Sequence, residues 1–102
     1  MKESKDAKEQ LKELKKEIRT LCSKLKKTRD IHPATKIKEV RSGLSDLANI
    51  PPDSEPVNIQ VGRILAKLQE TIGVLEKAMK ISSSGKLIQA HEFALELRDR
   101  IQ

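Results

Sequence analysis

The stretch VNIQVGRILAKLQETIGVLEKAMK, residues 57–80, decides the fold of this chain. Its apolar residues recur at steps of three and four, which places them on one face of an α-helix. These residues are Val61, Ile64, Leu65, Leu68, Ile72, Leu75 and Met79. Periodicity permits a single helix over the whole stretch, about 36 Å long at about 1.5 Å per residue.

Three further segments show the same helical spacing. The first covers residues 5–28, the second ends at the pair Pro51-Pro52, and the third follows SSSG at residues 82–85. Pro33 fits the first position of the second helix, where its missing N–H is not needed. The apolar positions are Leu11, Leu14, Ile18, Leu21, Cys22 and Leu25 in the first segment, Ile37, Val40, Leu44, Leu47 and Ile50 in the second, and Leu87, Ala90, Ala94, Leu97 and Ile101 in the third.

Composition favours helices packed on helices. The chain has 102 residues, 36% of them apolar, and Phe93 is its only aromatic residue, so the core consists of Leu, Ile, Val and Ala. We therefore predict an all-α fold, a compact antiparallel bundle of four to five helices over residues 10–102, with residues 1–9 as a charged N-terminal extension. The predicted core includes Leu44, Leu47, Leu68, Leu75 and Leu97.

The single cysteine and the hydropathy of the chain point to an intracellular protein. Cys22 excludes an intrachain disulfide, and small secreted scaffolds usually need several. We also find no apolar run long enough to span a bilayer and no apolar segment of a secretory signal near the N-terminus. We expect a monomeric domain without membrane contact.

The net charge of +6 is unevenly distributed. Residues 1–29 hold 11 Lys or Arg and 5 Asp or Glu, whereas residues 30–102 hold 10 of each. A basic segment of this kind can contact nucleic acid or an acidic partner. Its lysines alternate with Glu and Asp, however, and mixed charge at helical spacing is also typical of a solvated helix face. Both interpretations stay open, and the solvated face is favoured.

Motifs for catalysis, cofactors or metals are not visible in the sequence. SSSGK (82–86) lacks the upstream glycine, the following Ser or Thr and the preceding strand of a phosphate-binding loop. His32, His91 and Cys22 are not spaced as metal ligands. Cys22 lies on an apolar stripe, as a buried structural cysteine would. We expect no enzyme activity, no cofactor and no metal.

Topology predicts where a binding site would lie. Short connections make successive helices antiparallel neighbours, so the connections at 29–33 and 81–85 meet at the same end of the bundle. Ile31 lies in the first connection, and Met79 and Ile81 flank the second. Apolar residues at one end predict a surface there, although residues in connections can also simply plug the end of the bundle.

The second half of the chain resembles a known family. RILAKLQETIGVLEKAMKI (63–81) and HEFALELRDRI (91–101) are similar to the integrase-binding domain of the family of lens epithelium-derived growth factor and hepatoma-derived growth factor-related proteins, a relative of the N-terminal domain of elongation factor IIS. The similarity extends more weakly through LSDLANI (44–50) to Glu17. It is carried by Ile64, Leu65, Lys67, Ile72, Leu75 and Lys77, and by Glu92, Phe93, Leu97, Arg98, Arg100 and Ile101.

The resemblance implies a nuclear interaction domain. The family is a five-helix bundle whose loops at one end bind disordered linear motifs of chromatin and transcription proteins. The matching positions here are Asp30, Ile31, Met79, Lys80 and Ile81. Asp30 precedes Ile31, the reverse of the family's order, and Met79 replaces an aromatic residue. The resemblance also implies that residues 57–80 are broken into a short and a longer helix.

Overall fold

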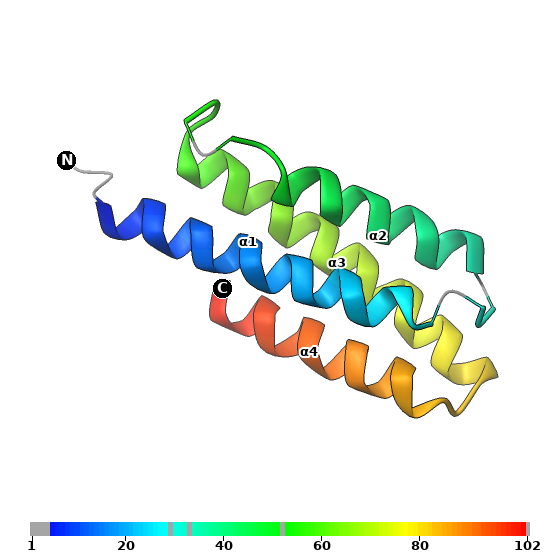
Figure 1. Cartoon of the computed structure of the whole chain (residues 1–102). Helices are drawn as coiled ribbons and strands as arrows, with labels where there is room; N and C mark the ends of the chain where they lie inside the picture. The colour runs from blue at the N-terminus through cyan, green and yellow to red at the C-terminus, as the bar shows by residue number, and fades with distance from the viewer. Residues whose placement is uncertain (1–4, 29, 33, 52, 102) are drawn as a thin grey trace.

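The computed structural model describes residues 5–28, 30–32, 34–51 and 53–101. Within these ranges the chain forms four α-helices and no strand (Figure 1). They are α1 (Lys5–Lys26), α2 (Ala34–Ala48), α3 (Val57–Ile81) and α4 (Gly85–Ile101). The predicted all-α bundle is confirmed. Among the described residues, no helix is long and apolar enough to cross a membrane.

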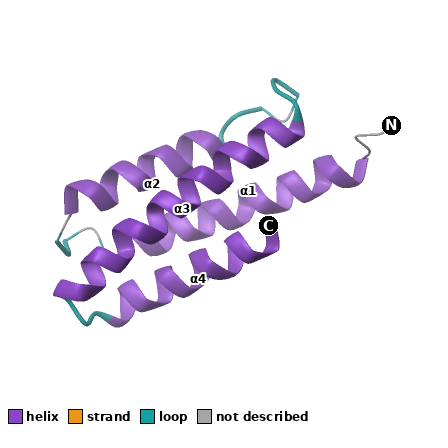
Figure 2. Ribbon diagram, turned by 180° about the vertical axis from the view of Figure 1, so that it is seen from behind, coloured by secondary structure: helices purple, strands orange, loops and turns teal. Residues whose placement is uncertain are grey.

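The helices run up and down around one core. Each helix packs against the next in sequence, and α4 returns beside α1, as two opposite views show (Figures 1 and 2). The connections α1–α2 and α3–α4 lie together at one end, which we call the loop end. The connection α2–α3 lies at the opposite end with the start of α1, which we call the open end. The predicted meeting of residues 29–33 and 81–85 is confirmed for their described residues.

The core is aliphatic and draws on all four helices. Leu44, Leu68, Leu75 and Leu97 are buried as predicted, each at 1% exposure or less. The prediction for Leu47 is wrong, because it is only partly buried and packs at the edge of the core. The inward stripe of α2 is Ile37, Val40, Leu44 and Ala48, so the small Ala48 takes the central position and Leu47 is turned about 100° away from it.

Residues 57–81 form one unbroken helix, so the break implied by the family resemblance is wrong for this chain. Periodicity predicted the single helix correctly. The inward stripe continues through Ile64, Leu68, Thr71, Leu75 and Ala78, and no proline interrupts it. Helix α3 begins after Pro56 and ends at Ser82, whose extended backbone leaves the helix while its N–H still donates to Ala78 O at 2.9 Å. Among the described residues the bundle therefore has four helices, not the family's five.

Helix α1 continues to Lys5 without a break, so residues 5–9 belong to the same helix as residues 10–26. Residues 1–4 of the predicted extension, and Pro33 at the predicted start of α2, lie outside the described residues. Leu11 is the first buried apolar residue of α1. Farther out, Lys8 Nζ lies 3.0 Å from Asp53 Oδ1 in the α2–α3 connection.

Basic side chains of α1 close the end of α2. The buried Lys15 Nζ donates to Ile50 O, and Arg19 Nη2 donates to Ala48 O at 3.0 Å. The last carbonyl groups of a helix have no partner within the helix and carry partial negative charge. Arg19 therefore places positive charge at the end of α2, and Lys15 supplies a hydrogen bond to the connection that follows it.

Candidate functional site

The first part of the candidate site is the connection that follows α1. The chain leaves the helix through a tight turn in which Thr28 is fully buried and its Oγ1 donates to Leu25 O at 2.8 Å. The N–H of Ile31 then donates to Thr28 O at 3.0 Å. This turn holds Ile31 partly buried against the core and leaves Asp30 exposed. The Asp30 carboxylate has no hydrogen-bond or ion-pair partner among the described side chains.

The second part is the last turn of α3. Met79, Lys80 and Ile81 are all helical, so their side chains diverge by about 100° per residue. Met79 is partly buried and packs against the core. Lys80 is exposed, and Ile81 has 65% of its surface exposed, more than the other exposed isoleucines Ile59 and Ile88.

The five predicted residues thus share one end of the bundle but do not have equal roles. Ile31 and Met79 contribute to the core, whereas Asp30, Lys80 and Ile81 face solvent. Met79 and Ile81 lie two residues apart on a helix, about 200° around its axis, so one small pocket does not hold both side chains. The accessible part of the candidate surface centres on Ile81.

Sequence reasoning missed Ile88 at this end. It lies in the first turn of α4 and is 41% exposed. The signal was available, because Ile88 falls outside the inward stripe of Leu87, Ala90, Ala94 and Leu97. An aliphatic residue off the buried stripe of an amphipathic helix is a candidate contact residue. The loop end therefore exposes isoleucines from two helices.

The two side chains that could act as a base or a nucleophile, His91 and Cys22, both make contacts within the bundle. His91 Nε2 is 3.1 Å from Glu76 Oε2 on the neighbouring helix. The Cys22 thiol donates to Arg41 O at 3.6 Å, and burial raises its pKa, with the nearby Arg41 acting in the opposite direction. A raised pKa leaves little thiolate at neutral pH, so Cys22 is a poor nucleophile. Among the described residues, no group of three or more His, Cys, Asp and Glu could hold a metal ion.

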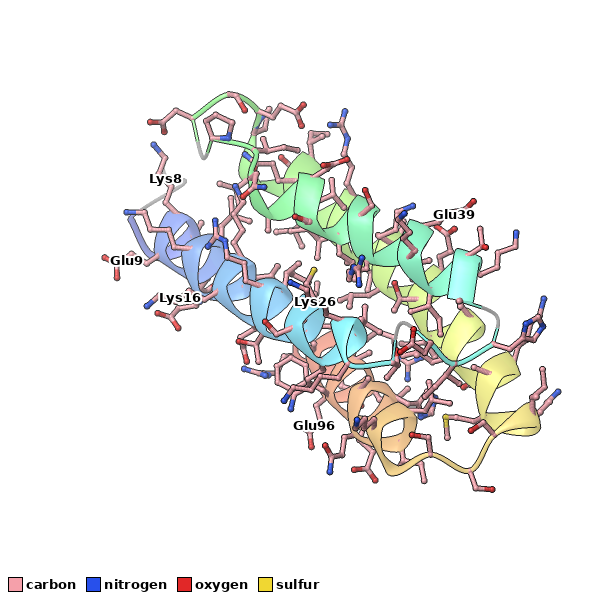
Figure 3. All side chains as sticks on the ribbon, turned by 45° about the vertical axis from the view of Figure 1, so that its right-hand side comes forward. Lys8, Glu9, Lys16, Lys26, Glu39 and Glu96 are labelled. Carbon is pink, nitrogen blue, oxygen red and sulfur yellow. The ribbon has the colours of Figure 1, made fainter. Side chains whose placement is uncertain are left out.

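The charged flanks of α1 differ. Lys8, Lys15 and Arg19 contact α2 or the α2–α3 connection. Figure 3 shows Lys8 turned toward that connection and Glu9 turned away from it. On the other flank, Glu17 accepts two hydrogen bonds from Arg100 of α4, at 2.7 and 2.5 Å. Basic side chains of α1 thus contact α2 and the α2–α3 connection, whereas Glu17 pairs with α4.

Comparison with known proteins identified no relative of this chain. No protein-family model, no curated protein and no solved structure matches the chain.

Proposed function

We propose that this chain is a protein-interaction domain that docks short disordered motifs through the loop end of its bundle. The observation that carries the proposal is Ile81, a large aliphatic residue left 65% exposed at the end of α3. The fold does not use this side chain for its core. An exposed aliphatic side chain with a second one, Ile88, at the same end of the bundle can serve as an apolar anchor for a partner.

The charge around Ile81 suggests the kind of motif. Lys80 precedes Ile81 and is exposed, so acidic residues beside the apolar anchor of a ligand would be attracted to it. Asp30 offers a carboxylate at the same end, which can accept hydrogen bonds from backbone N–H groups of an extended ligand. A motif with one or two aliphatic anchors and acidic neighbours fits this surface.

The chromatin setting rests on the family resemblance. By that resemblance, the partners are disordered segments of chromatin or transcription regulators, and the domain acts in the nucleus. The unbroken α3 and the four-helix count depart from the family, so partner choice is expected to differ. The support from this chain itself is the exposed aliphatic surface at the predicted end of the bundle.

The second hypothesis, contact with nucleic acid through the basic N-terminal helix, predicts a different dependence on salt. Phosphate contacts weaken steeply as salt concentration rises, whereas an apolar contact does not. Three of the basic residues on α1, namely Lys8, Lys15 and Arg19, already contact α2 or the α2–α3 connection. The exposed lysines Lys12 and Lys16 remain available for a phosphate backbone.

The test is selection from a display library of short peptides taken from disordered segments of nuclear proteins. Selected peptides are then titrated against wild type, Ile81→Glu and Ile59→Glu at low and high salt. Ile59 is a matched control, because it lies on the same helix at the open end and is also exposed, at 44%. We expect only Ile81→Glu to lose binding. Retained binding by a folded Ile81→Glu variant would contradict the proposal, whereas binding of duplex DNA that weakens steeply with salt would favour the nucleic-acid hypothesis.

A further inference from the structure

A groove lies at the open end of the bundle, remote from the loop end. Its volume is about 620 Å³, and it lies between the N-terminal halves of α1 and α3. Helix α4 closes one side of it with its last turn, including Ile101. Val57 and Ile81 mark the two ends of α3, so the groove and the Ile81 surface are separated by about 36 Å along that helix.

Within the described residues, α4 is shorter than its neighbours α1 and α3. Helix α4 has 17 residues, whereas α1 has 22 and α3 has 25. Figures 1 and 2 show α1 and α3 extending farther toward the open end than the last described turn of α4. The groove therefore lies beside the last described turn of α4, between α1 and α3.

The floor of the groove is aliphatic. Leu11 and Leu14 of α1 and Val57 and Val61 of α3 line it together with Ile101. Val57, Val61 and Ile101 are only partly buried, although they pack against the core. A partner that covers these partly exposed aliphatic side chains would remove apolar surface from water, which favours binding.

The rim of the groove is acidic although the whole chain is basic. Glu9, Glu13 and Glu17 line one side at steps of four residues along α1. Arg100 is the only basic residue that lines the described groove, and Glu17 is already paired with it. Glu13 is 3.9 Å from Lys16, and Glu9 has no ion-pair partner among the described side chains. Glu9 is therefore free to pair with a ligand, and Glu13 can do so in place of its long, exposed contact with Lys16.

We propose that this groove docks a short amphipathic helix of a partner protein, with aliphatic residues on one face and Lys or Arg on its flank. The partner helix would lie between α1 and α3 and place its aliphatic face on Val57, Val61 and Ile101. Its basic flank would pair with Glu9 and Glu13. The lined part of α1 runs from Ala7 to Glu17, which corresponds to about 15 Å or three turns of such a helix.

The test uses a synthetic helical peptide of about three turns, with leucines at i, i+3, i+4 and i+7 and lysines on its flank. A second peptide carries glutamates in place of the lysines, and a third carries serines in place of the leucines. Each is titrated by fluorescence anisotropy against the full chain. We expect binding of the first peptide alone, with perturbed methyl resonances at Val57, Val61 and Ile101.

Two charge-reversal variants localise the binding. Glu9→Lys combined with Glu13→Lys should weaken binding of the lysine peptide by about tenfold, because two attractive pairs become repulsive. Glu39→Lys combined with Glu92→Lys makes the same change in net charge at exposed positions that do not line the groove, and it should leave binding unchanged. Circular dichroism verifies that both variants fold.

Several results would overturn the proposal. They are absence of binding by the lysine peptide, equal binding by the glutamate or serine peptide, an equal loss in both double variants, and methyl perturbations confined to the loop end. Sedimentation of the wild-type chain tests one more outcome, which is self-association. If the chain self-associates and Glu9→Lys with Glu13→Lys abolishes this, the occupant is a second copy of the chain.

Discussion

The two ends of the bundle expose apolar surface in different ways. At the loop end, Ile31 and Met79 turn inward and close the core, while Ile81 turns outward. At the open end the apolar side chains, among them Val57 and Val61, pack against the core but stay partly exposed along the groove.

This difference separates two kinds of binding surface. Ile81 can be changed without disturbing the core, because 65% of its surface is already in solvent. Val57 and Val61 contribute to folding and to the groove at once, so changing them affects both. Function at the loop end should therefore be separable from stability by a single substitution, whereas at the open end it is separable only through the charged rim.

The largest expected effect concerns the core that both ends share. Leu68 is fully buried near the middle of α3, and Leu68→Ala should lower the free energy of unfolding by about 2–5 kcal/mol. Urea denaturation followed by circular dichroism measures this. A loss below about 0.5 kcal/mol, the range of surface substitutions, would mean that this face of α3 is not the common core.

The second effect sharpens the comparison at the open end. Lys15→Met should lower the free energy of unfolding by about 1–2 kcal/mol, because the buried ammonium group no longer donates to the carbonyl of Ile50. Thermal melts compare this variant with Lys12→Met, an exposed lysine of the same helix. Equal stability of the two variants would show that Lys15 does not hold the end of α2.

Lys15 also predicts a dependence on pH. Burial lowers its pKa from 10.5, and the neighbouring Arg19 lowers it further. Between the lowered pKa and 10.5, the unfolded chain binds more protons than the folded chain, so stability should rise with pH in that window. Urea titrations at several pH values detect the slope, which Lys15→Met should remove.

A smaller and stabilising effect tests whether space is open along α3. A Cβ added at Gly62 or at Gly73 would meet no heavy atom within 4 Å. Both Gly62→Ala and Gly73→Ala should therefore gain about 0.5–1 kcal/mol from helix propensity. Gly43→Ala should gain less, because its Cβ would lie 2.9 Å from Lys67 Cε and that side chain must move. If Gly62→Ala instead lowered the free energy of unfolding, the space beside Gly62 at the open end would not be empty.

Much of the fold could be predicted from the sequence, because the helices follow from the spacing of the apolar residues. Steps of three and four located the four helices and most of the buried leucines. Leu47 was misassigned because the choice between Leu47 and Ala48 for the inward position depends on how α2 is rotated against its neighbours. The family resemblance wrongly predicted a break in α3, whereas the unbroken apolar stripe of this chain correctly predicted a single helix.

The candidate sites were predictable to different degrees. The exposure of Ile81 follows from its position outside the stripe that ends at Ala78, and the same reasoning would have found Ile88. The groove could not be predicted from the sequence, because it depends on how α1, α3 and α4 pack against one another. Glu9, Glu13 and Glu17 are visible as a periodic acidic set, but only packing shows which helix they face.

The central claim is that Ile81 forms a binding surface that folding does not require, and one titration tests it most directly. A peptide selected by the wild-type chain is titrated against Ile81→Glu and Ile59→Glu, whose melting temperatures are recorded on the same samples. We predict a loss of affinity of about tenfold or more for Ile81→Glu, as expected for an anchor residue, with Ile59→Glu unchanged and both variants as stable as the wild type. Equal affinities of the two folded variants, or a molten Ile81→Glu variant, would contradict the claim.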